Sequence, residues 1–434
     1  MVIQEKKKDK RKRTKKAIRR QNAKLYPFYK MLSWDLLCFY SIEFLFYTIT
    51  KQISASEVLI TSALYQIFII VMYIPAVTIT DLLGRKKGII IGNTLIVLFL
   101  ICLMVLPGMI SIILANLIFA LGYNMKSIAE SNLLYDSVAT KGGDGLYSKL
   151  EAKGGSLYYL FDGIASLLAG YLFVIHNYLP ILICLLFAVI SMILAFQFEE
   201  VYPVETTKVK TNLWKTVKAY TKDLKQSCHF ILKSKRMESF ILFGAVFTGI
   251  ITIVDTCRGD LLTDLGIGPE QFSAIFAILI FIGGISIRLK ERIEKKFKNR
   301  SLTVLSLTYI LACIAIGAVT LNVTNQMVVP IVLLLYTFQY ICTSNWYILE
   351  EKYGKNFTKP EKRNQITFTY EFVGAILSSM LALGGSVLLD HTSASVTFLL
   401  CGLAFLALMI CILDYMSSRF GLKPEQYRKE DIDF

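Results

Sequence analysis

Twelve apolar segments occupy most of this chain, and each is long enough to cross a bilayer as an α-helix, which takes about 20 residues. With 55% hydrophobic and only 18% charged residues, the chain could not hide its apolar surface inside a soluble fold. The segments do not alternate in polarity as barrel strands do. We predict an all-α polytopic membrane protein with twelve transmembrane helices, at 32–50, 58–80, 88–106, 109–134, 156–175, 178–198, 239–257, 271–289, 301–321, 326–348, 366–389 and 394–416.

The basic residues predict the orientation of these spans. If both ends of the chain and every second loop lie on one side, that side receives all of the 47 Lys and Arg residues except Lys51, Lys126 and Arg258. By the positive-inside rule this side is the cytoplasm. We expect a multi-pass protein of the bacterial plasma (inner) membrane with cytoplasmic termini. The net charge of +15 then indicates contact with the lipid bilayer, not with nucleic acid.

The spans fall into two groups of six that a basic segment separates. Within that segment, apolar residues such as Leu213, Val217 and Tyr220 recur at helical spacing, which predicts an amphipathic helix on the membrane surface. We expect a basic cytoplasmic tail at 1–26, an N-terminal half at 27–198, a linker at 199–238, a C-terminal half at 239–416 and a second tail at 417–434.

A short charged loop joins the second and third predicted spans. It contains Asp81-Leu82-Leu83-Gly84-Arg85-Lys86-Lys87, in which Gly84 permits a sharp turn and Asp81 and Arg85 can form an ion pair. In this position the loop resembles the signature loop of the major facilitator superfamily of transporters. The resemblance covers residues 27–416 and implies two six-helix halves, with this loop as part of a gate.

The end of the fourth predicted span carries a second resemblance. Residues 127–137 include Leu133-Leu134-Tyr135-Asp136-Ser137 and are similar to a stretch in a group of bacterial transporters that are mostly regarded as exporters. Glu130 matches the first acidic position of that stretch, whereas Ser131 replaces the second. The resemblance implies that Asp136 pairs with Arg85. The alternative is a helix-end aspartate that water solvates.

The sequence also departs from the family pattern. Val77 stands where the family usually has Gly, so a close approach of spans two and eleven is in doubt. The corresponding loop of the second half, at 287–296, has lost the Asp-x-x-Gly-Arg order. The fifth span lacks the Gly-Pro pattern of many drug/proton antiporters, and this absence weakens an assignment of the chain to that class.

Charged residues inside the spans are the candidates for a transport site, because an ionisable group at the bilayer centre costs at least about 2.5–3.5 kcal/mol and therefore needs a cavity or a partner. In the family, spans 1, 4, 7 and 10 line the substrate cavity. We expect the substrate and proton cavity to be lined by Tyr40, Glu43, Tyr47, Lys126, Glu130, Asp162, Asp255, Tyr336 and Tyr340, and the gate to contain Asp81, Gly84, Arg85, Lys86 and Asp136.

Several of these residues have a simpler interpretation. Lys126 and Glu130 are four residues apart and could neutralise each other on one helix face. Asp162 could cap or anchor a helix end, and Asp255 could pair with Arg258 at the outer interface. Glu43 lies in the middle of its span without a local cation, so a role in the cavity or in proton binding is favoured for it.

The predicted function is secondary active transport without catalysis. The three histidines are scattered and the cysteines form no CxxC pair, so we expect no metal, no cofactor and no enzyme. We expect a monomer that exports an amphiphilic or cationic small molecule or a short peptide in exchange for protons. Two alternatives stay open: import of an anionic nutrient held by Lys126 and Arg258, and lipid or lipopeptide flipping.

Overall fold

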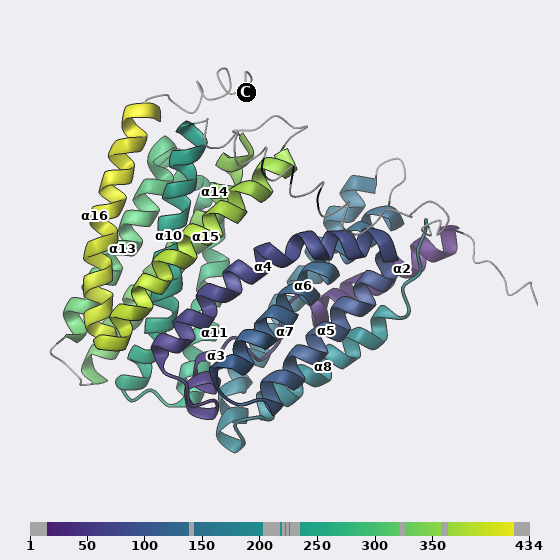
Figure 1. Ribbon diagram of the computed structural model, residues 1–434, viewed down its shortest axis with the longest axis horizontal. Helices are drawn as coiled ribbons and strands as arrows, with labels where there is room; N and C mark the ends of the chain where they lie inside the picture. The colour runs from purple at the N-terminus through teal and green to yellow at the C-terminus, as the bar shows by residue number, and fades with distance from the viewer. Residues whose placement is uncertain are drawn as a thin grey trace, which may run out of the picture.

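The computed structural model describes residues 15–138, 143–202, 218, 222, 225, 235–321, 326–356 and 363–420. All regular secondary structure in these residues is helical. Figure 1 shows two bundles that lie against each other near α3 and α11 and diverge toward the upper edge of the view. The predicted amphipathic helix of the linker lies outside the described residues.

The N-terminal half consists of seven α-helices and one π-helical turn in the described residues. The elements are α2 (Lys15–Ser33), α3 (Glu43–Leu45), η1 (Phe46–Thr50), α4 (Ala55–Leu83), α5 (Arg85–Val105), α6 (Gly108–Val138), α7 (Gly143–Ile175) and α8 (Leu179–Ala195).

The C-terminal half has seven α-helices in the described residues, with three short 3₁₀ turns between them. The elements are α10 (Lys235–Asp264), α11 (Pro269–Ser286), η2 (Ile287–Leu289), α12 (Lys290–Phe297), η3 (Lys298–Arg300), α13 (Ser301–Thr320), η4 (Gln326–Val328), α14 (Val329–Asn356), α15 (Arg363–His391) and α16 (Ala394–Phe420).

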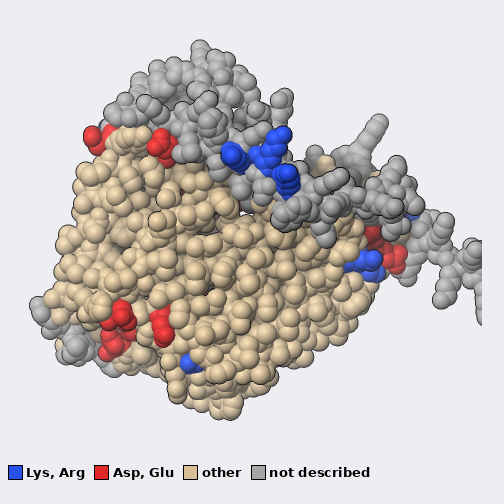
Figure 2. Space-filling view, viewed as in Figure 1, with Lys and Arg blue, Asp and Glu red and all other residues tan. Residues whose placement is uncertain are grey.

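Nine helices of the described residues are long and apolar enough to span a membrane, and they match nine of the twelve predicted spans. Of the other three, α8 is apolar but shorter, and α14 is long but carries the buried polar residues Gln339 and Asn345. The first span is irregular. The face shown in Figure 2 has its charged side chains at the two ends and an uncharged band between them, as a surface facing hydrocarbon requires.

The first span differs from the predicted helix at 32–50. Helix α2 ends at Ser33, an irregular segment follows, and helical structure resumes only at Glu43. Two observations account for the break: Cys38 has a positive φ of 65°, and the Asp35 carboxylate accepts the backbone N–H of Leu36 at 2.9 Å, which competes with the helical pattern. Residues 15–26, predicted as tail, form the first part of α2.

The most extensive contacts between the two halves are made by two pairs of helices, α4 with α15 and α7 with α11. Helices α7 and α11 approach closely because Gly170 has no side chain: a Cβ there would lie 2.2 Å from the Pro269 carbonyl oxygen. Helices α4 and α15 approach each other one third of the way along α4, where Ser379 donates to the Ala63 carbonyl at 2.9 Å; Val77 lies farther along α4.

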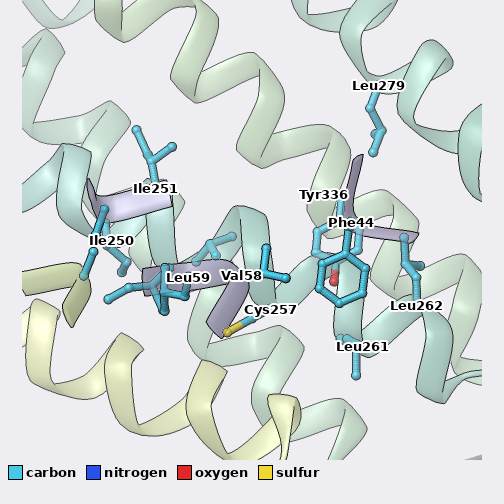
Figure 3. Packing of buried hydrophobic residues seen from close by; sticks show 14 of the residues in the cluster. Phe44, Val58, Leu59, Ile250, Ile251, Cys257, Leu261, Leu262, Leu279 and Tyr336 are labelled. Carbon is cyan, nitrogen blue, oxygen red and sulfur yellow. The ribbon is translucent and has the colours of Figure 1, made fainter. Parts of the chain in front are cut away.

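An apolar seal closes the space between the halves near α3. Phe44 of α3 lies among Leu261, Leu262 and Tyr336 of the other half, and Val58 lies beside Cys257 (Figure 3). All of these side chains are buried. We call this the α3 end of the molecule and the opposite end, where α4 turns into α5, the Gly84 end.

Candidate functional site

Polar contacts between the halves reinforce the seal. At the α3 end, Ser56 Oγ donates to Asp390 Oδ1 at 3.0 Å. Further in, the amide of Gln66 on α4 donates to Thr252 Oγ1 at 2.6 Å and accepts from Ser378 Oγ at 2.9 Å, so that it joins α10 and α15. These bonds involve short side chains on facing helices, and they hold the two halves together on this side of the site.

The break in the first span is held by a lysine from α6. Lys126 Nζ donates to the carbonyl of Ser33, the last residue of α2, and lies 3.5 Å from the carbonyl of Trp34, which follows it. A cation there satisfies acceptors that a helix end leaves open and complements the negative end of the helix dipole. Lys126 is 2% exposed, and backbone carbonyls accept the hydrogen bonds of its ammonium group.

Glu130 pairs with α2 and not with Lys126. Lys30 Nζ forms an ion pair with Glu130, lies 3.6 Å from Glu151 Oε1 on α7, and covers the ring of Trp34 at 4.5 Å. The direct ion pair of Glu130 is therefore with Lys30. Glu130 Oε2 is buried without a hydrogen-bond partner in the described structure.

Three carboxylates lie around the same break and are only partly buried: Asp35, Glu43 and Asp162. Asp35 Oδ1 accepts from the hydroxyl of Tyr40 at 2.7 Å. Asp35 lies just after α2, Glu43 begins α3 and Asp162 lies on α7. Tyr40 is 39% exposed, so this cluster borders open space.

Arg258 on α10 forms the centre of the corresponding cluster in the C-terminal half. Its Nη1 atom lies 2.9 Å from Asp255 Oδ1 and donates to Tyr340 Oη at 3.0 Å. The rings of Tyr336 and Tyr340 lie 5.0 and 4.7 Å from the guanidinium carbon. The ion pair of Asp255 with Arg258 is the one that the alternative interpretation predicts; the Arg258 side chain is 2% exposed and the Asp255 side chain 55%.

The gate residues gather at the Gly84 end. Arg85 forms an ion pair with Asp136 at the end of α6, as the resemblance implies, whereas Asp81 is exposed and makes no ion pair with Arg85. Gly84 both ends α4 and precedes α5, with a φ of 89°. Glu200, which follows α8, accepts the Lys86 N–H at 2.9 Å and so caps α5.

Not every predicted cavity residue reaches open space. Tyr47 and Tyr336 are buried, and Tyr47 packs between the rings of Phe39 and Phe46. Tyr40, Glu43 and Tyr47 were expected on one face of a helix, but Tyr40 lies in the irregular segment. The break removes the helical spacing on which that expectation depended.

The accessible charges of the site are acidic and its basic groups are not accessible. Asp255 is exposed and Asp35, Glu43 and Asp162 are half-buried, whereas Lys126 and Arg258 are almost fully buried. Asp255 lies on α10, the most buried of the nine spanning helices. An exposed carboxylate on such a helix faces water between the halves, because exposure to hydrocarbon would be too costly.

Four residues of the site were missed from the sequence: Lys30, Asp35, Gln66 and Glu200. Lys30 and Asp35 flank the start of the predicted first span, where charges are expected for topological reasons alone. Asp35 carried a signal, since it lies inside an apolar segment at 32–50. Gln66 and Glu200 form contacts with residues more than a hundred positions away, which no local pattern predicts.

A family model and the solved structures agree on this architecture. The model of the Major Facilitator Superfamily matches residues 35–380. No curated relative matches the sequence.

Three similar solved structures are distant in sequence. The nucleoside transporter NupG has a TM-score of 0.69 at 13% identity, over 92% of this chain and 99% of that one. A POT family transporter in complex with 5-aminolevulinic acid has a TM-score of 0.61 at 14% identity, over 92% and 95%. The peptide transporter POT in complex with sulfate has a TM-score of 0.63 at 12% identity, over 93% and 94%. At these identities the likeness establishes the fold.

Proposed function

The chain belongs to the major facilitator superfamily and is a transporter, not an enzyme, and on this premise we propose that it exports a cationic, partly apolar small molecule in exchange for protons. The two halves would rock about the site between them, so that the seal at the α3 end and the gate at the Gly84 end open in turn. We place the protein in a bacterial inner membrane, with the Gly84 end and both termini in the cytoplasm.

One observation carries the substrate class: the carboxylates of the site are accessible and its cations are buried and paired. Asp255 and Glu43 are accessible to a solute. The exposed ring of Tyr40 lies just before α3, which carries Glu43, and the exposed ring of Tyr347 lies on α14. Carboxylates and aromatic faces both attract an organic cation. An anionic nutrient would need Lys126 or Arg258, but backbone carbonyls and Asp255 already hold these groups.

Proton exchange gives the direction and the driving force. A membrane potential of 100 mV supplies about 2.3 kcal/mol for each proton that moves inward. Glu43 is the acid that we assign to coupling, because no cation in the described structure forms an ion pair with it.

The test uses the purified full chain in proteoliposomes with an imposed pH gradient. Ethidium serves as a cationic aromatic probe, uridine as a neutral one and carboxyfluorescein as an anionic one, and the Arg85→Ala variant controls for leakage. We expect gradient-driven accumulation of the cation and release of protons on its addition. Uptake of carboxyfluorescein or uridine in preference to ethidium would contradict the proposed substrate class.

A further inference from the structure

The outward face of α2 carries three cations and then an aromatic ring, each one helical turn from the next. Lys16, Arg20, Lys24 and Phe28 are four residues apart and all exposed. This row is about 18 Å long at 1.5 Å per residue. The three cations form no ion pair with the described residues, so their charge is available to a ligand.

The opposite face of α2 is fixed to the protein, which determines that the row points outward. Buried Asn22 donates to Ser137 Oγ at 2.9 Å and to the Glu199 carbonyl at 2.8 Å. Arg19 donates to Tyr202 Oη at 2.9 Å, and Lys15 lies over the same ring at 4.6 Å. The helix therefore cannot rotate to turn its basic row inward without breaking these bonds.

A groove runs along the basic row. Its volume is about 700 Å³, and it is lined by Lys16, Arg20 and Lys24 together with Leu25 and Phe28. The order matters: the cations lie toward the start of α2, and the apolar side chains lie toward Ser33, where the first span begins. Phe28 is 57% exposed, which an aromatic ring tolerates well when a lipid covers it.

We propose that this groove binds an anionic phospholipid of the surrounding bilayer. The headgroup phosphate lies against Arg20 and Lys24, with Lys16 beyond it, and the first part of an acyl chain covers Leu25 and Phe28. A soluble phosphate would use the cations but leave the apolar floor uncovered. The gradient from charged to aromatic along one helix face matches a lipid that stands alongside the helix at the membrane interface.

Binding at this groove reaches the transport site through α2 itself. The last turn of the same helix contains Lys30, which pairs with Glu130, and Ser33, whose carbonyl accepts a hydrogen bond from Lys126. A lipid that holds α2 in place thus also holds the Lys30 ammonium, which positions Glu130, and the Ser33 carbonyl, which positions Lys126. This inference concerns the outer face of α2 and holds whatever solute the transporter carries.

The test compares two double variants of the full chain that remove the same charge from different surfaces. Arg20→Gln/Lys24→Gln removes the groove cations, and Arg288→Gln/Arg292→Gln, which changes two exposed arginines of η2 and α12, is the matched control. Dioctanoylphosphatidylglycerol is titrated into the detergent-solubilised proteins and bound lipid is counted by native mass spectrometry. Dioctanoylphosphatidylcholine and glycerol phosphate are titrated in parallel, and thermal unfolding checks that each variant is folded.

We expect the groove variant to lose about thirtyfold in affinity for the anionic lipid, as two surface cations would give, and the control far less. Phe28→Ser should weaken lipid binding and leave the selectivity for the anionic headgroup. Equal losses in the two double variants would overturn the proposal in favour of net charge alone. Tight binding of glycerol phosphate would indicate a soluble ligand, and equal binding of the choline lipid would exclude anionic selectivity.

Discussion

The ammonium group of Lys126 donates a hydrogen bond to the carbonyl oxygen of Ser33, the last residue of α2. The two residues lie on different helices, and the bond closes the helix end at which the first span breaks. It gives Lys126 a structural role that its sequence position did not reveal.

Replacing this lysine should destabilise the protein. Lys126→Met keeps the length of the side chain but leaves buried carbonyls without a donor, which costs about 1–3 kcal/mol. We expect a lower melting temperature of the detergent-solubilised protein. Lys153→Met changes an exposed lysine and serves as the control. Equal melting temperatures for the two variants would show that the bond to α2 contributes nothing.

Gly84→Ala should destabilise the turn between α4 and α5 for two separable reasons. The backbone conformation there, at a φ of 89°, disfavours any side chain, at a cost of about 1–3 kcal/mol. A Cβ would also lie 2.6 Å from Glu200 Oε1. In the Glu200→Ala background the second cost disappears. The loss of stability in the Gly84→Ala/Glu200→Ala variant should therefore be smaller than the sum of the losses in the two single variants. Gly163→Ala, where nothing lies within 4 Å, should be harmless; strict additivity would rule out the contact.

The Arg85 and Asp136 pair should act as one unit in transport. Arg85→Ala and Asp136→Asn should each reduce transport with normal membrane insertion, and the double variant should be no worse than either single one. Transport rates in proteoliposomes measure this, with Lys87→Ala as an exposed control in the same loop. Losses that add up would show that the two residues act independently of their ion pair.

Substitutions at Glu43 test whether this residue couples transport to protons. Glu43→Gln mimics a permanently protonated carboxyl group, so we expect loss of pH-driven transport while substrate binding and passive exchange remain. Glu43→Asp keeps an ionisable group and should retain part of the coupling. Glu57→Gln is the control, because Gln can replace Glu in the capping box at Ser54. If the Glu43→Gln variant still concentrates substrate as the parent does, coupling belongs to Asp35, Glu130, Asp162 or Asp255.

Alternating access can be tested at the seal. Ser56 and Asp390 belong to different halves and their side chains are hydrogen-bonded at 3.0 Å. Ser56→Cys/Asp390→Cys, joined by a short bifunctional thiol reagent, should hold the α3 end closed and stop transport, and a cleavable reagent should restore it on reduction. Each single variant treated in the same way controls for modification of native cysteines. Unchanged transport by the cross-linked protein would mean that this end need not open.

The sequence predicted the features that depend on short stretches of chain. Nine spans follow from the length of apolar runs, because the bilayer sets one thickness for all of them. The turn at Gly84 follows from a residue type that tolerates a positive φ, and the loop motif indicated the family. The break in the first predicted span was not predictable from hydropathy, since residues 36–50 are mostly apolar with or without a helix.

The partners in the site were decided only by the tertiary structure. Glu130 had a lysine one helical turn away, yet it pairs with Lys30, which is 100 residues distant. Lys126 binds carbonyls 93 residues away, and Arg258 contacts Tyr340 across 82 residues. Sequence spacing lists the groups that can meet on one helix face, but the packing of one helix against another selects which of them do. Which charges stay accessible, and hence the proposed substrate class, depends on that selection.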